Sequence, residues 1–194
     1  MTVIEKIAVR NLGLTRYSDV LQDMRAFTRR MAGEEIWLTE HEPVYTLGQG
    51  APDRAVANAI PVVRTDRGGD ITYHGPGQTI LYALVDLAGR GIKVKRYVSL
   101  LEQSVIDLVG GERRAGAPGV YVDGAKIAAL GIRVVRGRAY HGLSLNVDMD
   151  LSPFSAIDPC GYPGLKVTQM KDLGLSTERV GERLAAILIE KLDA

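Results

Sequence analysis

The chain has 194 residues, of which 46% are hydrophobic, and this suffices for one globular domain with a substantial core. Its 24 Lys and Arg residues nearly balance its 23 Asp and Glu residues, and the net charge of +1 predicts no general affinity for nucleic acid or for anionic membranes. A single cysteine excludes an intramolecular disulfide framework, and histidines at positions 41, 74 and 141 lack the spacing of a zinc site, so neither a metal nor another cofactor is expected.

The beginning of the sequence, MTVIEKIAVRNLG, alternates charged and apolar residues and lacks the apolar core of a signal peptide. No later run approaches the ~18 apolar residues of a membrane span. Because a lone cysteine also suits a reducing compartment, we expect a cytoplasmic protein that does not bind membranes.

Three stretches predict helices, because apolar residues recur in them at helical spacing: residues 18–31, 98–109 and 177–192. The apolar stripe of the first consists of Val20, Leu21, Met24, Phe27 and Met31. In the last, Ser176 is expected to cap the start of the helix.

Short apolar or alternating runs between Gly, Pro and Asp clusters predict strands. They cover residues 3–9, 34–38, 43–47, 61–65, 70–74, 79–87, 120–130 and 132–147, whereas residues 108–119 are expected to form a surface loop. Asp123 and Gly124 suit a two-residue hairpin turn, which implies antiparallel pairing. Since strands and helices do not alternate as in successive β-α-β units, we expect an α+β fold in a single domain, residues 1–194.

Four glycines surround a short strand in residues 67–78, RGGDITYHGPGQ. Glycines allow a ligand to approach the main chain closely, so this stretch is either a binding wall that ends at His74 or two ordinary turns. It matches neither the phosphate loop nor the dinucleotide fingerprint.

Lys126 follows the predicted hairpin turn in a strand whose two faces are both apolar. It is therefore either a partly buried amine with a chemical role or a lysine that reaches solvent at the margin of the sheet. His141, beside Gly142 at the start of a strand, is by default a histidine that hydrogen-bonds locally.

Cys160 lies in DPCGYPG, residues 158–164, where prolines and glycines exclude a regular helix or a central strand. A free cysteine is often a buried and inert residue, but reactive residues are commonly presented on rigid loops. Both interpretations remain open from these residues alone.

The sequence combines RGGDITYHGPGQ at 67–78, DGAKIAALGIRVVRGRAYHGLSLNV at 123–147 and IDPCGYPG at 157–164. Together, in this order, they resemble the signature segments of the bacterial octanoyltransferases of lipoate biosynthesis, also called lipoyl(octanoyl) transferases. The resemblance spans residues 41–170. It implies transfer of an octanoyl group from octanoyl-acyl carrier protein, through a thioester on the enzyme, to one lysine of a lipoyl domain. The acceptors would be the lipoyl domains of 2-oxoacid dehydrogenase E2 subunits and the glycine cleavage H protein.

The resemblance also assigns roles, with Cys160 matching the family nucleophile and Lys126 the lysine paired with it. The residues that match the acyl-binding segments are Arg67, Gly68, Gly69, Asp70, Ile71, Thr72, Tyr73, His74, Ala129, Leu130, Gly131, Gly142, Leu143 and Ser144. Asp70 occupies a position that varies in the family. The implied fold, like that of the catalytic domains of lipoate and biotin protein ligases, is a mixed, largely antiparallel sheet flanked by helices.

This chemistry requires no nucleotide, because one thioester is exchanged for another and the later attack by an amine yields a more stable amide. An ordinary thiol of pKa ~8.5 is about 3% ionised at pH 7, and lowering its pKa by about two units raises that fraction roughly 25-fold. Nucleophilicity falls about eightfold at the same time, so the net gain is about threefold. We therefore expect Lys126 to act also as a general acid/base.

The alternatives to this function are an ATP-dependent lipoate-protein ligase, an acyl-thioester hydrolase and a non-catalytic acyl-binding module. The lack of a phosphate loop disfavours the first, and the presence of both Cys160 and Lys126 disfavours the last. No protease signature surrounds the cysteine.

Basic residues form two groups that are candidates for docking an acidic carrier protein. They are Arg133, Arg136 and Arg138, and Lys93, Lys95 and Arg96.

Overall fold

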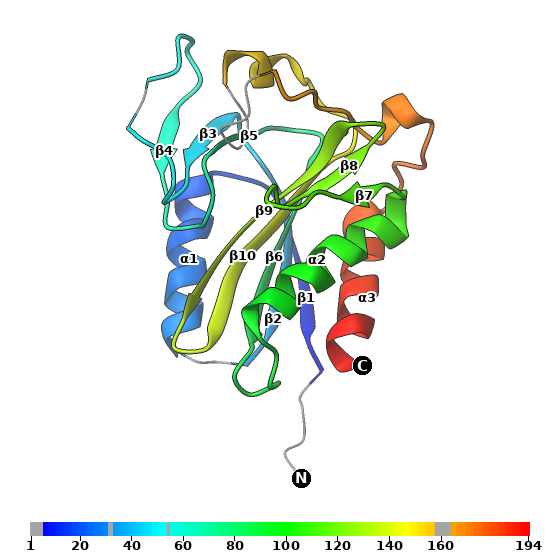
Figure 1. Cartoon of the computed structure of the whole chain (residues 1–194). Helices are drawn as coiled ribbons and strands as arrows, with labels where there is room; N and C mark the ends of the chain where they lie inside the picture. The colour runs from blue at the N-terminus through cyan, green and yellow to red at the C-terminus, as the bar shows by residue number, and fades with distance from the viewer. Residues whose placement is uncertain (1–5, 31–32, 54, 158–163) are drawn as a thin grey trace.

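The structure is a computed structural model that describes residues 6–30, 33–53, 55–157 and 164–194 (Figure 1). Its α-helices are α1 (Tyr17–Arg30), α2 (Val94–Val109) and α3 (Val180–Asp193). Its strands are β1 (Ala8–Thr15), β2 (Glu35–His41), β3 (Val44–Leu47), β4 (Val62–Arg64), β5 (Ile71–His74), β6 (Gln78–Asp86), β7 (Glu112–Arg113), β8 (Val120–Val122), β9 (Ala125–Val135) and β10 (Arg138–Asn146). Short 3-10 helices cover Ser152–Ala156 and Lys171–Leu173.

In the described part of the chain these strands form two sheets. The larger has seven strands in the order β1-β2-β6-β10-β9-β8-β7, and only the β1–β2 pair in it is parallel. The smaller has the order β4-β3-β5, with β3 parallel to β4 and antiparallel to β5. The expected α+β fold with a mixed, largely antiparallel sheet is confirmed.

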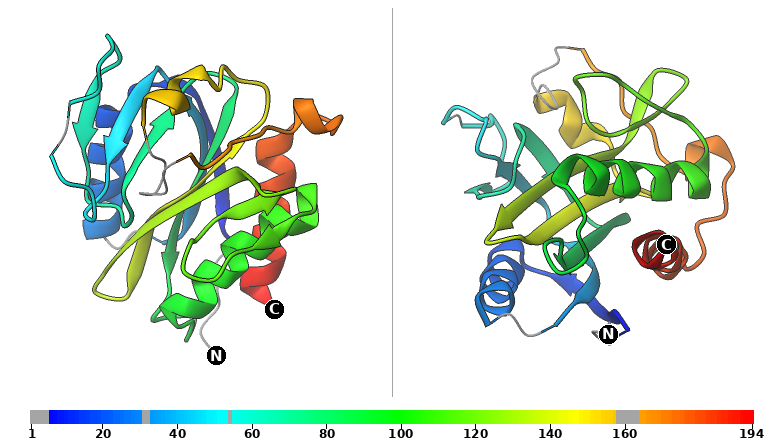
Figure 2. Two further views of the ribbon diagram at one scale, coloured as in Figure 1. Left: turned by 45° about the horizontal axis from the view of Figure 1, so that its top comes forward. Right: turned by 60° about the horizontal axis from the view of Figure 1, so that its bottom comes forward.

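Helices cover both faces of the large sheet (Figure 2), and the central strand β6 shows why. Side chains alternate between the two faces of a strand. Leu81, Ala83 and Val85 therefore belong to the core beneath α2 and α3. The intervening residues Ile80, Tyr82 and Leu84 pack in a second core together with α1. Because β6 is apolar on both faces between Ile80 and Val85, it packs against the helices on both sides of the sheet.

The small sheet packs against the 3-10 helix Ser152–Ala156 in a third core. The rings of Tyr73 and Phe154 meet edge to face with 5.5 Å between their centroids, and Tyr45 donates a hydrogen bond to the Pro153 carbonyl at 2.8 Å. This packing fixes the position of the chain just before residues 158–163, which lie outside the described residues.

The predicted hairpin at Asp123 and Gly124 is confirmed, since both residues have positive φ, 47° and 81°, between β8 and β9. Residues 3–5 of the predicted first strand lie outside the described residues, and in the described part the bounds differ, because β1 covers Ala8–Thr15 and so extends well beyond residue 9. β1 is an edge strand whose side chains are mostly exposed, so it lacks the apolar pattern by which a strand is predicted.

Two helix starts also differ from the prediction. Helix α2 begins at Val94, a turn before residue 98. Ser176 does not cap α3, because this helix begins only at Val180, after Arg179 in a left-handed conformation, and the Ser176 hydroxyl accepts a hydrogen bond from the Glu178 amide in the preceding turn. No helix in the described ranges is long and apolar enough to cross a membrane.

Candidate active site

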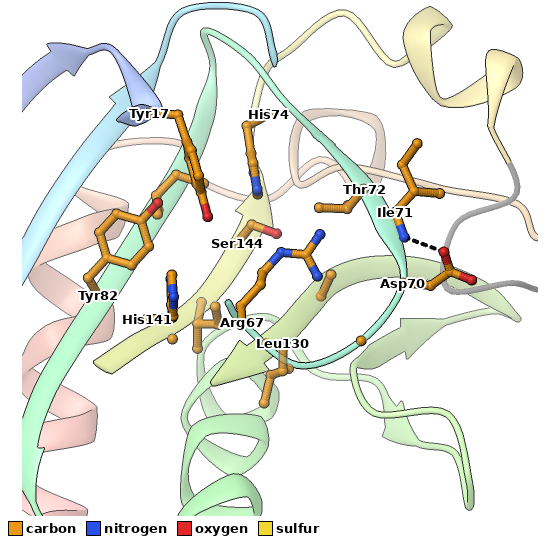
Figure 3. Close-up of a pocket in the computed structure, with 16 residues that line it drawn as sticks. Tyr17, Arg67, Asp70, Ile71, Thr72, His74, Tyr82, Leu130, His141 and Ser144 are labelled. Atoms are coloured by element: carbon orange, nitrogen blue, oxygen red, sulfur yellow. Dashed lines mark hydrogen bonds between the residues drawn. The ribbon is translucent and has the colours of Figure 1, made fainter. Parts of the chain in front are cut away.

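A cavity of about 40 Å³ lies where β5 and the loop before it face β9 and β10 (Figure 3). Its lining consists of Tyr17, Arg67, Gly69, Asp70, Ile71, Thr72, His74, Ile80, Tyr82, Ala129, Leu130, Gly131, His141, Gly142, Leu143 and Ser144. Figure 3 shows Tyr17, Tyr82 and His141 at one end, Asp70, Ile71 and Thr72 at the other, and Arg67 between them. We call this space the inner cavity.

All but two of the residues predicted to bind the acyl group line the inner cavity. The exceptions are Gly68, whose amide donates to the Ile132 carbonyl at 3.0 Å, and Tyr73, which packs in the third core. Tyr73 points away because it alternates with Thr72 and His74 along β5. The hydrogen bond of Gly68 instead attaches the loop before β5 to β9, so this glycine stabilises the wall of the inner cavity without lining it.

Four residues of the lining were not predicted to bind the acyl group: His141, which was expected only to hydrogen-bond locally, and Tyr17, Ile80 and Tyr82, which the sequence analysis missed. Tyr17 belongs to α1, far from the glycine-rich segments, and the other two lie in an apolar run that is indistinguishable from ordinary core strand. No local pattern marks them. The phenol of Tyr17 donates to the Thr65 hydroxyl at 2.9 Å, and the phenol of Tyr82 donates to His41 at 2.7 Å.

Lys126 lines a smaller cavity, of about 10 Å³, beside the inner cavity. Thr72, Ala129 and Ser144 line both spaces, so the amine lies next to the Thr72 end of the inner cavity. Lys126 is 3% exposed, which is deeper than a lysine that reaches solvent at a sheet margin. A charged or reactive amine in such a place is a common feature of catalytic sites.

Gly119 and Tyr121 shape the space around the Lys126 side chain. The ammonium Nζ lies 5.4 Å from the centroid of the Tyr121 ring, within the range of a cation–π contact. A Cβ added to Gly119, where φ is 140°, would lie 2.8 Å from Lys126 Cε. The amide of Gly119 donates to the buried carboxylate of Glu102 at 3.1 Å. Gly119 and Tyr121 therefore border the space that the Lys126 side chain occupies, and we call this space the channel of Lys126.

The backbone of Lys126 is held by the segment that follows residue 163. The Lys126 amide donates to the Lys166 carbonyl at 2.8 Å, and the Thr168 amide donates to the Lys126 carbonyl at 3.0 Å. Asn146 holds the same segment by donating to the Thr168 carbonyl at 3.0 Å. Asn146 in turn accepts from Gln78 at 2.9 Å, and Gln78 accepts from His74 at 2.7 Å. A chain of hydrogen bonds thus connects both cavities.

Cys160, the predicted nucleophile, lies outside the described residues. The described chain on its two sides includes Phe154 and Val167, and both residues line the cavity of Lys126. The segments that flank the cysteine are therefore anchored beside the lysine.

Two histidines near the inner cavity are neutral at pH 7. Burial lowers the pKa of His41 to about 4, against the opposing effect of its hydrogen bond to the Thr15 carbonyl. Burial also lowers the pKa of His74 to about 3, and the neighbouring His41 acts in the same direction. Neither ring presents a positive charge to a ligand in the cavity.

His141 is buried in an unusual backbone conformation with φ of 62°. Its Nε2–H donates to Asp66 at 2.8 Å, and burial lowers its pKa although this carboxylate opposes the shift. Burial raises the pKa of Asp66, but hydrogen bonds from His141, Tyr140 and Arg25 outweigh it and hold the pKa well below the usual range. Asp66 is thus ionised and fixes the tautomer of His141.

The two basic groups predicted to dock a carrier protein lie far from Lys126. Nine residues of extended β9 separate Lys126 from Val135, which is about 30 Å. The loop before α2 lies at that same distant end, since the Ala88 amide donates to the Gly137 carbonyl at 3.1 Å. Arg138 is moreover 9% exposed and donates to Asp86 at 3.1 Å. Their position does not favour delivery of a thioester to Lys126.

No cluster of three or more metal-ligating side chains occurs among the described residues.

The family described as "Lipoyl protein ligase A/B catalytic domain" matches residues 17–189. Among curated relatives, an octanoyltransferase of Aromatoleum aromaticum is 56% identical over 194 residues, which cover 94% of this chain and 84% of that protein. An octanoyltransferase of Thiobacillus denitrificans is 58% identical over 180 residues, which cover 88% and 83%.

Solved structures share the fold at much lower identity. A lipoate-protein ligase A bound with ATP superposes with a TM-score of 0.70 at 15% identity, covering 95% of this chain and 83% of that one. A biotin protein ligase from Leishmania major in complex with biotin gives 0.53 at 14%, covering 95% and 72%. The predicted likeness in fold to the lipoate and biotin ligases is confirmed.

The lowered pKa values of His41 and His74 predict a pH-dependent stability. Both rings are neutral when folded, whereas an unfolded histidine titrates near pH 6.5. Below that pH the unfolded chain binds protons that the folded chain rejects, so the free energy of unfolding should fall from pH 6.5 towards 4 by up to about 1.4 kcal/mol per pH unit for each histidine. Urea unfolding at pH 6.5, 5.5 and 4.5 measures this slope. His41→Gln should reduce this slope by about the contribution of one histidine. A slope equal to that of the wild type would refute the lowered pKa of His41.

Proposed function

Since the chain belongs to the family of lipoyl protein ligase A/B catalytic domains and acts as an octanoyltransferase in protein lipoylation, we propose that the octanoyl group passes from octanoyl-acyl carrier protein to Cys160 and then to a lysine of a lipoyl domain. The observation that carries the proposal is the position of Lys126. It is buried beside the inner cavity, and the described segments before and after Cys160 line its surroundings.

In the first half-reaction, the Cys160 thiolate attacks the carbonyl carbon of the carrier's thioester. A new C–S bond forms, the bond to the carrier's sulfur breaks, and the Lys126 ammonium gives its proton to the leaving thiolate. The products are octanoyl-Cys160, the free carrier thiol and a neutral Lys126. Backbone amides of the strand that carries Ala129 and Gly131 are candidates to stabilise the oxyanion.

In the second half-reaction, neutral Lys126 takes a proton from the ammonium of the incoming acceptor lysine. The free amine attacks the octanoyl thioester, the C–S bond breaks, and the products are the amide and the Cys160 thiolate. The second amine proton leaves to solvent. Because Lys126 ends protonated and Cys160 ends ionised, the pair returns to its initial state without a nucleotide.

The inner cavity is proposed to hold the octanoyl tail. Its volume of about 40 Å³ has room for only a few water molecules, so the walls must part to admit eight carbons. Arg67 is the largest flexible group in the lining, and it is held by its hydrogen bonds to the Thr46 carbonyl and hydroxyl at 2.7 and 2.8 Å. We propose that the acyl chain enters as the Arg67 side chain moves aside.

The proposed acceptors are the lipoyl domains of 2-oxoacid dehydrogenase E2 subunits and the glycine cleavage H protein, in the cytoplasm. Residues 1–194 are proposed to act as one catalytic domain. An ATP-dependent ligase is the principal alternative, because one protein with this fold is a lipoate-protein ligase bound with ATP. The two functions differ in whether transfer requires a nucleotide.

Incubation with octanoyl-acyl carrier protein, without ATP, should add the mass of one octanoyl group to the intact protein. Hydroxylamine should remove it, because it cleaves thioesters. Cys160→Ser should not acquire the thioester, and transfer to a lipoyl domain should not increase when ATP is added. A wild-type protein that never acquires the mass, or a serine variant labelled at another residue, would exclude covalent catalysis through Cys160.

Lys126→Arg separates charge from proton transfer. Arginine keeps the positive charge but does not release its proton near neutral pH. The variant should still load octanoyl on Cys160 slowly, yet lose transfer to the acceptor lysine by about 10²-fold or more, as is typical for a lost general acid/base. Single-turnover measurements of the two half-reactions test this. Near-normal transfer would reassign the proton to another group.

Gly119→Ala should block the channel of the Lys126 side chain. The added Cβ would lie 2.8 Å from Lys126 Cε and 2.7 Å from the Ala128 carbonyl oxygen. We expect at least a tenfold loss of octanoyl transfer and a stability loss of about 1–3 kcal/mol. The control is Gly91→Ala, where φ is also positive, 66°, but the added Cβ meets no atom within 4 Å. Equal activities of the two variants would show that the channel is unimportant.

A further inference from the structure

A second cavity, of about 520 Å³, lies between the C-terminal half of α1 and the turn that joins β9 to β10. Its lining consists of Arg25, Thr28, Arg29, Asp66, Val135, Arg136, Arg138 and Tyr140. The volume is within the range of small-molecule sites, about 300–1,000 Å³. We call this space the arginine cavity. It is at the end of β9 opposite Lys126, so it is not part of the transfer site.

The arginine cavity carries an excess of positive charge. Arg25 pairs with Asp66 at 2.9 Å, and Arg138 pairs with Asp86 at 3.1 Å. Within the described ranges the side chains of Arg29 and Arg136, which are both exposed, have no acidic partner and no hydrogen bond. Asp66 is the one carboxylate of the lining, so two guanidinium charges are left uncompensated around one recessed space.

Two buried polar atoms in the same lining have no hydrogen-bond partner in the described structure: the Thr28 hydroxyl and the Nε of Arg138. Both residues are only 9% exposed. Buried polar groups are almost always paired, so these two atoms are exceptions beside the cavity, although neither has an accessible surface in it. The charge of Arg29 alone does not indicate a bound anion, because a cation in the last turn of a helix is already stabilised by the helix dipole. Arg136 lies in a turn, so no helix dipole of its own stabilises its charge.

We propose that the arginine cavity binds a small anion with a phosphate group, either inorganic phosphate or a phosphomonoester. Arginine guanidinium groups match phosphate geometry through pairs of N–H donors. The Tyr140 ring and Val135 give the cavity an apolar side on which the body of a phosphomonoester can pack. A second acidic residue is missing from the described lining, which disfavours a cationic ligand.

Asp66 connects the arginine cavity to the inner cavity. Its carboxylate accepts from Arg25 at 2.9 Å and from Tyr140 at 2.7 Å on one side, and from His141 at 2.8 Å on the other. An anion that attracts Arg25 competes with Asp66 for the guanidinium and weakens the support of His141, which lines the inner cavity. Resting on the proposed function, we infer that the anion changes the KM for octanoyl-carrier more than kcat.

Binding is tested by calorimetry of the full chain at constant ionic strength, with inorganic phosphate and adenosine monophosphate as separate probes. Wild type should bind at least one of them with a Kd below about 1 mM. Arg136→Gln should weaken binding by about tenfold or more. Arg96→Gln removes the same charge from an exposed position on α2 and should leave the Kd unchanged.

The two probes distinguish the sources of the phosphate. Equal affinities indicate a site for phosphate alone, and tighter binding of the nucleotide indicates a phosphomonoester. The site would be overturned if neither probe gave a heat of binding at 10 mM. It would also be overturned if Arg136→Gln and Arg96→Gln lost equal binding affinity. Because octanoyl transfer is measured separately, a chain that transfers octanoyl but binds neither probe refutes only this inference. A chain that binds phosphate but never transfers octanoyl refutes only the proposed function.

Discussion

The pairing of β10 with its two neighbours β6 and β9 is the constraint on which the site depends. Gly142 lies opposite Gly131 on β9, and a Cβ added to it would lie 2.1 Å from the Leu81 carbonyl oxygen on β6. Glycine is therefore required there for the strands to approach each other. The same register sets Ser144 opposite Ala129, so the wall of the inner cavity is made of small residues. Lys126 and the Arg136 turn then occupy opposite ends of β9, which separates transfer chemistry from the arginine cavity.

The end of the inner cavity away from Lys126 is polar but not charged. Tyr82 donates to His41 at 2.7 Å, and this histidine is neutral because burial lowers its pKa. A charged ring beside an acyl tail would cost several kcal/mol of desolvation, whereas a neutral pair of hydrogen-bonded groups costs little. The acidic end of the network, Asp66, keeps its charge because it accepts three hydrogen bonds. The carboxylate of Asp66 thus lies outside the lining of the inner cavity, the proposed acyl space.

Local patterns predicted those parts of the site that depend on local geometry. The alternation of a strand marked Lys126 as a lysine between apolar positions, and its 3% exposure agrees. The turn at Asp123 followed from its dipeptide. Tyr17 could not be found, because only tertiary packing brings this residue of α1 beside His74 of β5. The edge strand β1 forms by backbone pairing without an apolar pattern. The role of Cys160 follows from family resemblance and stays a prediction.

If the octanoyl tail occupies the inner cavity as proposed, the polar end of this cavity favours a short acyl chain over a long one. Each further methylene buried gains about 0.8 kcal/mol. A tail that extends past Leu143 meets Tyr82 and His141, whose hydrogen bonds to His41 and Asp66 measure 2.7 and 2.8 Å. Separating either buried pair leaves unsatisfied groups at about 1–3 kcal/mol each. Since a broken pair leaves two such groups and costs about 2–6 kcal/mol, it offsets roughly three to seven methylenes, and added length stops being favourable where the apolar wall ends. In this proposed binding mode, the buried hydrogen bonds of Tyr82 and His141 limit the length of the acyl chain.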